Sequence, residues 1–143
     1  MSQCFFNQKY KVFFSDFSVR KYRKSFSKKY GKKAWNVTEI SIKESLERIA
    51  NIEGRSVLSF ICNTNRNTIF AKYSFRIANS NICPKISGNR CILEICNTKR
   101  HVEVLFIYCK SHIPSREKNE TSWWKKVVSD NFGKHCLKHG ENR

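Results

Sequence analysis

The stretch GNRCILEICNTKRHVEVLFIYCKSH, from Gly88 to His112, decides the fold. Its two apolar runs, Cys91–Cys96 and Val102–Cys109, flank the polar tetrad Asn97–Arg100, and this pattern predicts a β-hairpin. The second run is apolar at successive positions, so both faces of that strand are expected to be covered. The hairpin therefore predicts the centre of a sheet.

Cations stand at one end of this apolar hairpin. Arg90 precedes the first run, and Lys110 and His112 follow the second. In antiparallel neighbours the start of one strand lies beside the end of the next, so Arg90 and Lys110 are expected to lie close together. The apolar body of the hairpin is then expected to form part of the core, and its cationic end is expected to form a functional site. The alternative is that these are ordinary strand ends, which are often exposed and basic.

The N-terminal half predicts one strand and a helical hairpin. Lys9–Phe14 is typical of a strand, and apolar residues at helical spacing between Val19 and Phe26 predict a first helix, which Gly31 ends. A capping-box pattern at Ser41–Glu44 predicts the start of a second helix. Its inward positions are expected to be Ile42, Leu46 and Ile49.

The C-terminal half predicts strands followed by one more helix. Alternating runs predict strands over residues 56–62 and 68–78, with a loop over 79–89. Residues 119–132 predict a short helix capped by Thr121 or Ser122, and the basic tail over about 133–143 is expected to fray. The chain 1–143 is thus predicted to be a single α+β domain. An N-terminal strand and helical hairpin would pack on an antiparallel sheet of about four to five strands, with a short C-terminal helix.

The charge balance is the unusual feature of the composition. The 143 residues include 28 Lys and Arg against 11 Asp and Glu, a net charge of +17. Such an excess opposes compact folding through self-repulsion, so it predicts a polyanionic partner. Nucleic acid is the first candidate, and an anionic membrane surface is the second. The longest apolar run, Val102–Cys109, contains Glu103 and is far too short to span a membrane.

The seven cysteines are odd in number and form no CxxC pair. They predict free thiols in a reducing cytoplasm rather than a disulfide framework. The loose group His135, Cys136 and His139 is interpreted as part of the basic tail rather than as a zinc site. No metal or cofactor is predicted.

A basic run covers the first predicted helix and the turn after it. No acidic residue occurs between Asp16 and Glu39. A basic face of this kind binds phosphate groups without sequence preference, so we expect it to contact RNA. The alternative is a helix face that is simply exposed to solvent. The predicted RNA-binding residues are Arg20, Lys21, Arg23, Lys24, Lys28, Lys29, Lys32, Lys33 and, from the loop before the hairpin, Lys85.

Four stretches in succession resemble the RelE/ParE toxin superfamily, the toxin halves of toxin–antitoxin pairs. They are KYKVFFSDFSVRKYRKSF from Lys9, FAKYSFRIANSN from Phe70, GNRCILEI from Gly88 and VEVLFIYCKSH from Val102. The resemblance covers roughly residues 9–112 and implies a RelE-like fold. For the RelE branch it implies a metal-independent, ribosome-dependent endoribonuclease that cleaves mRNA through attack by the substrate's 2′-hydroxyl.

The resemblance also implies roles for individual residues. Lys72 matches a basic strand residue, Arg76 the arginine that closes this strand, Arg90 the phosphate-binding arginine and Lys110 the lysine that ends the last strand. His112 would act as acid or base, since its ordinary pKa is close to neutral pH. Two positions depart from the RelE branch: Ser74 and Ser111 stand where that branch has lysine and arginine.

The partners implied are a cognate antitoxin with an acidic or amphipathic segment, and mRNA and ribosomal RNA on the ribosome, with no membrane. Arg90→Ala is expected to abolish growth arrest and leave the fold intact. Two alternatives stay open: a non-catalytic RNA- or DNA-binding protein on the same scaffold, and a ParE-like gyrase poison.

Overall fold

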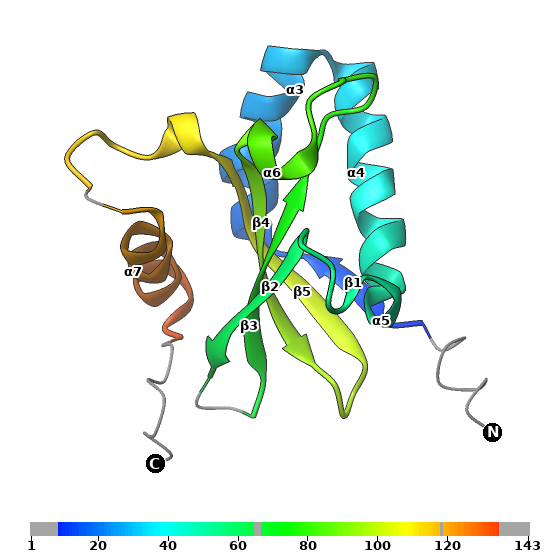
Figure 1. Cartoon of the computed structure of the whole chain (residues 1–143). Helices are drawn as coiled ribbons and strands as arrows, with labels where there is room; N and C mark the ends of the chain where they lie inside the picture. Colours follow the sequence, from blue (N-terminus) through cyan, green and yellow to red (C-terminus); the bar gives the residue numbers. More distant parts are fainter. Residues whose placement is uncertain (1–8, 65–66, 118, 135–143) are drawn as a thin grey trace.

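The computed structural model describes residues 9–64, 67–117 and 119–134, apart from the side chain of Tyr22. Figure 1 shows the succession of helices and strands. The strands are β1 (Lys11–Phe14), β2 (Leu58–Asn63), β3 (Ile69–Phe75), β4 (Asn89–Cys96) and β5 (His101–Cys109). The helices are α2 (Asp16–Ser18), α3 (Lys24–Tyr30), α4 (Lys32–Glu47), α5 (Ile49–Ile52), α6 (Pro84–Ser87) and α7 (Glu120–Phe132). A π-helical turn (Val19–Arg23) joins α2 to α3, and a 3-10 turn (Lys110–His112) follows β5.

The described strands form one sheet in the order β1-β5-β4-β3-β2. The predicted hairpin is the antiparallel pair β4 and β5, and these two strands and β3 lie inside the sheet. The predicted α+β class is therefore confirmed. One pairing differs from the antiparallel expectation, because β1 runs parallel to β5. The long connection from β1 to this parallel neighbour consists of the helical segment, which lies on one face of the sheet, and of strands β2, β3 and β4.

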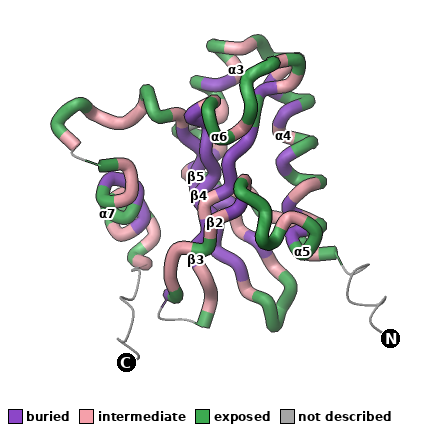
Figure 2. The backbone as a smooth tube through the Cα atoms, in the orientation of Figure 1, coloured by how far each residue is buried: buried purple, intermediate pink, exposed green. Residues whose placement is uncertain are grey.

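Helices cover both faces of the sheet (Figure 1). On one face the rings of Phe26 in α3 and Trp35 in α4 lie 5.9 and 6.1 Å from the ring of Phe75 in β3. On the other face the indole of Trp124 in α7 lies 6.1 Å from the ring of Phe70. Figure 2 shows the buried residues concentrated along the central strands between these two helical layers.

The second helix begins earlier than the sequence predicted. Helix α4 starts at Lys32, directly after Gly31, whose φ of 94° lets the chain reverse without a loop. The expected helix start at Ser41–Glu44 is wrong. The signal that was missed is the helical spacing of the buried residues Trp35, Thr38, Ile42 and Leu46. The predicted inward positions Ile42, Leu46 and Ile49 are confirmed as buried.

Smaller differences concern the ends of elements. The predicted loop 79–89 contains the one-turn helix α6, which begins at Pro84. Helix α7 is capped by Asn119, whose side chain accepts a hydrogen bond from the Ser122 backbone, so the predicted Thr121 or Ser122 cap is wrong. The predicted frayed tail lies almost wholly outside the described residues.

Four described cysteines, Cys83, Cys91, Cys96 and Cys109, are free thiols. Cys62 in edge strand β2 is disulfide-bonded. The prediction of free thiols is thus confirmed for those four and wrong for Cys62. Disulfides are rare in a reducing compartment, so the Cys62 bond gives the predicted cytoplasmic location no support. Among the described helices, none is both long and apolar enough to cross a membrane.

Candidate functional site

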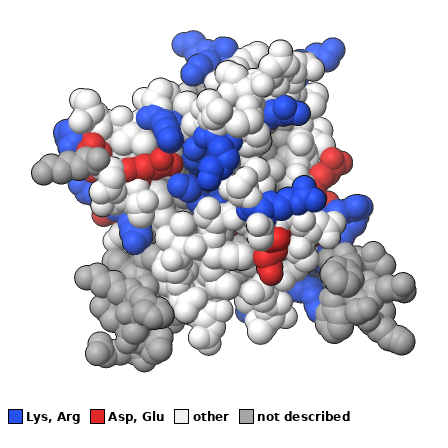
Figure 3. Space-filling view, viewed as in Figure 1, with Lys and Arg blue, Asp and Glu red and all other residues white. Residues whose placement is uncertain are grey.

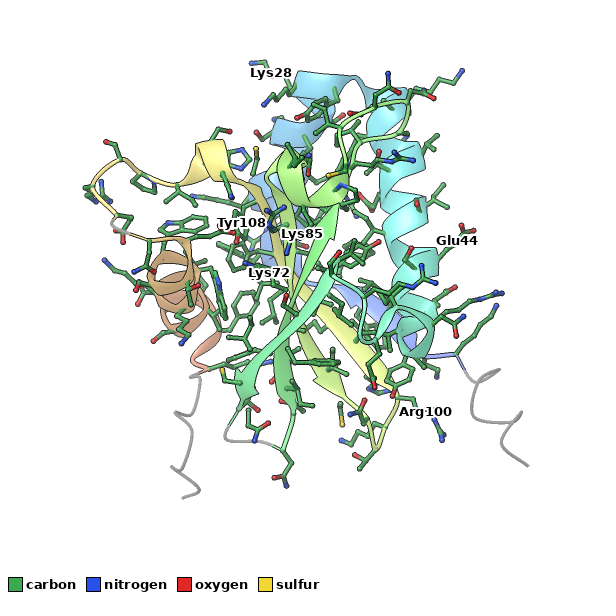
Figure 4. The ribbon with its side chains drawn as sticks, in the orientation of Figure 1. Lys28, Glu44, Lys72, Lys85, Arg100 and Tyr108 are labelled. Atoms are coloured by element: carbon green, nitrogen blue, oxygen red, sulfur yellow. The ribbon has the colours of Figure 1, made fainter. Side chains whose placement is uncertain are left out.

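Four cations meet on the sheet face that α7 covers: Lys72, Lys85, Arg90 and Lys110. We call them the cation cluster. Each of the other three lies close enough to Lys72 to disfavour its charged form. Figure 4 shows Lys72 and Lys85 beside Tyr108 over the middle of the sheet, and Figure 3 shows the basic patch there, bordered by acidic atoms on the side of α7.

Strand register explains why these residues meet. Ser74, Arg90 and Tyr108 form one row across β3, β4 and β5, and Lys72 belongs to the next row on the same face. The backbone N–H of Lys110 donates to the carbonyl of Gly88 at 3.0 Å, which holds the end of β5 beside the start of β4. The structure therefore brings Arg90 and Lys110 together, as antiparallel pairing predicted.

Arg90 is the buried member of the cluster. Its guanidinium donates to the carbonyl oxygens of Pro84, Lys85 and Asn89 at 3.2, 2.9 and 3.1 Å, so it ties α6 to β4. Only 5% of its side chain is exposed. Its Nε has no hydrogen-bond partner among the described residues, although it points toward a carboxylate of α7.

That carboxylate belongs to Glu120, the first residue of α7, which sequence reasoning missed. Its Oε2 accepts a hydrogen bond from the Tyr108 hydroxyl and lies 3.8 Å from Arg90 Nε and 4.0 Å from Lys72 Nζ. Burial and this hydrogen bond raise the pKa of Tyr108, so the hydroxyl keeps its proton. Nothing near Glu120 in the sequence indicates such a role, because the contact joins α7 to three strands.

Lys72 is the member whose protonation is most affected by its surroundings. Burial lowers its pKa, and Arg90, Lys85 and Lys110 act in the same direction, whereas Glu120 opposes them. A lysine with a lowered pKa can release or accept a proton closer to neutral pH than an exposed lysine can. Lys72 is thus the cluster residue best suited to proton transfer.

Two of the predicted catalytic residues lie apart from the cluster's ion pairs. Arg76 follows the last residue of β3 and is exposed, and no ion pair joins it to another described residue. His112 packs against the helical layer instead, with its ring edge against Phe26 at 5.6 Å. Its Nδ1 accepts from the Cys109 backbone N–H at 2.9 Å, and its Nε2 lies 3.2 Å from Ser25 Oγ. Both ring nitrogens are therefore engaged.

The packing of His112 predicts that acid weakens the fold. Burial lowers the His112 pKa, with Lys29 adding to the effect, and protonation would remove the acceptor that the Cys109 N–H uses. The pKa of His112 in the folded protein is below the ordinary value of 6.5. Neutral His112 therefore contributes fully to the free energy of unfolding above pH 6.5, and this contribution is lost as the pH falls through the lowered pKa. Urea midpoints at pH 7.5 and 5.0 should therefore differ less for His112→Gln than for the unchanged protein. His101→Gln is the matched control; an equal effect of both substitutions would contradict this assignment.

The predicted RNA-binding helix is basic and largely exposed. Arg23 is the exception, because its guanidinium pairs with both carboxylate oxygens of Glu39 in α4. The exposed cations of this surface are Arg20, Lys21, Lys24, Lys28, Lys29, Lys32 and Lys33. They belong to the helical layer opposite α7, so the basic helix and the cation cluster lie on opposite faces of the sheet. Lys85, predicted for the same RNA contact, belongs to the cluster.

Among the described residues, no three His, Cys, Asp or Glu side chains lie close enough together to bind a metal ion. The group His135, Cys136 and His139 lies outside the described residues. Comparison of the chain with models of known protein families, with characterised proteins and with solved structures finds no match.

Proposed function

We propose that the protein is a RelE-like toxin that binds translating ribosomes and cleaves mRNA. The observation that carries this proposal is the cation cluster, in which Lys72 has a lowered pKa and is surrounded by three other cations. RNA cleavage by the substrate's 2′-hydroxyl needs cations for the charge that grows on the phosphate and groups that move two protons. The cluster contains side chains suited to both tasks.

In the proposed reaction, the 2′-oxygen attacks the neighbouring phosphorus and the bond from phosphorus to the 5′-oxygen breaks, which leaves a 2′,3′-cyclic phosphate. Lys85, Lys110 and Arg90 hold the charged oxygens, and the buried Arg90 guanidinium also fixes the α6 backbone beside them. Lys72 in its neutral form takes the proton of the 2′-hydroxyl and then gives a proton to the departing 5′-oxygen, so that it ends the reaction in the form in which it began.

The basic helix supplies the second part of the proposal. Its exposed lysines suit ribosomal RNA phosphates, which would hold the protein on the ribosome without sequence preference. The proposed location is the cytoplasm, where the Cys62 disulfide is expected to be reduced. A cognate antitoxin would place an acidic or amphipathic segment against the cationic surface.

Primer extension on mRNA from a translating extract tests the proposal. The purified protein is expected to produce discrete cuts inside reading frames, and Lys72→Ala and Lys110→Ala should reduce them by about 100-fold or more. Lys99→Ala is the matched control, since this exposed lysine lies in the β4–β5 turn at the far end of the hairpin from Lys110. Intact mRNA with unimpeded translation would overturn the nuclease proposal.

A non-catalytic nucleic-acid-binding protein is the second candidate, favoured by the net charge of +17 and by basic surfaces on both helical layers. In that case each lysine substitution should weaken RNA binding by a similar small step. It should also lower, by about one, the slope of the logarithm of the binding constant against the logarithm of the salt concentration. An enzyme instead loses activity sharply at one or two positions while binding is nearly kept. A supercoiling assay distinguishes the third candidate, a gyrase poison.

A further inference from the structure

We propose that Lys72, Arg90 and Tyr108 form a phosphate-binding site, and that Glu120 of the same chain occupies it as a resident anion. The inference rests on the proposed function for its ligand, an RNA phosphodiester, and it adds how access to that site is controlled. Phosphate and the Glu120 carboxylate would compete for the same three side chains.

Three side chains converge on one carboxylate oxygen of Glu120. Glu120 Oε2 accepts from the Tyr108 hydroxyl and faces Arg90 Nε and Lys72 Nζ. These groups come from three adjacent strands of the sheet, so the site is held by the most buried part of the molecule. Donors fixed on rigid elements in this way bind an anion without reorganising.

The Glu120 carboxylate lies too far from the two cations for close hydrogen bonds. Its distances of 3.8 Å from Arg90 Nε and 4.0 Å from Lys72 Nζ exceed the 2.7–2.9 Å typical of charge-assisted hydrogen bonds. Arg90 Nε is buried and has no hydrogen-bond partner in the described part of the chain. A tetrahedral phosphate carries more acceptor oxygens than a carboxylate, so it can bond Tyr108 and Arg90 together.

Glu120 lies at a helix end that favours an anion. It stands in the first turn of the 13-residue helix α7, where the helix dipole favours negative charge. The Tyr108 hydroxyl donates to the Glu120 carboxylate, and two cations face the same oxygen. Glu120 therefore lies where a counter-ion to the cations of the site would lie.

The position of Glu120 in the chain allows it to leave the site. It follows the segment that connects the 3-10 turn to α7, whose described residues 113–117 and 119 belong to no helix or strand. The rest of α7 is held separately, by buried Trp124 and Val128 and by the ion pair of Lys134 with Glu94. The Glu120 side chain can thus turn away from the cluster while α7, from Trp123 onward, stays packed on Tyr108 and Phe106.

Glu120→Gln in the full chain tests the inference, with Glu117→Gln as the control of equal charge change. Glu117 lies in the same segment and is ion-paired with exposed Arg116 rather than with the cluster. Fluorescence anisotropy with a short single-stranded RNA should show about tenfold tighter binding for Glu120→Gln than for Glu117→Gln. Inorganic phosphate should also raise the melting temperature of Glu120→Gln more than that of Glu117→Gln, because it fills the vacated site.

Equal or weaker RNA binding by Glu120→Gln would overturn the inference. So would loss of mRNA cleavage with unchanged RNA binding, which would make Glu120 a catalytic base. Tighter binding and phosphate stabilisation without any cleavage by the unchanged protein would support the site and remove the nuclease proposal. Glu120→Ala is a second variant with the same expected order, should the glutamine protein fail to fold.

Discussion

Replacing Arg90 by alanine is expected to lower the free energy of unfolding by about 3–5 kcal/mol, the range for breaking a buried charge pair by removing one partner. The guanidinium is almost wholly buried and donates to three backbone carbonyls, of which two belong to α6. Alanine would leave those acceptors without donors and Glu120 without its nearest cation. Helix α6 and the start of α7 should therefore loosen together.

Urea unfolding followed by circular dichroism measures this loss. Arg116→Ala is the control, because Arg116 is 80% exposed and lies 4.0 Å from Glu117, so its loss should change stability by less than about 0.5 kcal/mol. An Arg90→Ala protein as stable as the control would show that the buried hydrogen bonds contribute little. Burial of Arg90 thus argues against the expectation that Arg90→Ala leaves the fold intact.

Because Arg90 is buried and structural, its alanine variant is a poor test of where the active site lies. Loss of toxicity in Arg90→Ala would not distinguish a missing phosphate contact from a disordered α6. Lys72, Lys85 and Lys110 are more exposed and make fewer structural bonds, so their alanine variants report on chemistry more directly.

The central hairpin could be predicted because its signals are local. Two apolar runs and a polar tetrad specify β4 and β5, and apolar residues on both faces of β5 indicate an internal strand. The approach of Lys110 to Arg90 follows from antiparallel pairing alone, without knowledge of the rest of the fold.

The remaining features depend on contacts distant in sequence. The parallel pairing of β1 with β5 joins residues about ninety positions apart, and nothing in the first strand specifies that neighbour. Glu120 lies on a helix whose existence was predicted, but its position over Lys72 and Arg90 depends on how α7 docks. The start of α4 was missed for another reason, since a capping-box pattern at Ser41–Glu44 falls inside a longer helix.

Truncating Trp124 to alanine should be about as destabilising as the Arg90 substitution, at about 3–5 kcal/mol, because a large core side chain leaves a cavity that the backbone fills only in part. The indole of Trp124 is fully buried and packs edge-on against Phe70. Its Nε1 has no hydrogen-bond partner among the described residues. Trp124→Phe keeps the ring and removes that donor, so it should cost much less than alanine, and exposed Lys125→Ala should cost almost nothing.

Trp124→Ala also tests whether α7 restrains the cation cluster. Trp124 lies one helical turn from Glu120, so a helix that loses the Phe70 contact holds its carboxylate over Lys72 and Arg90 less firmly. If Glu120 competes with phosphate, Trp124→Ala should bind single-stranded RNA more tightly than Trp124→Phe under conditions where both are folded. Tighter binding despite lower stability would be hard to explain by general unfolding, since loss of the sheet would scatter the cations that bind RNA. Unchanged RNA binding in a less stable Trp124→Ala protein would instead show that α7 stabilises the sheet without controlling access to the cluster.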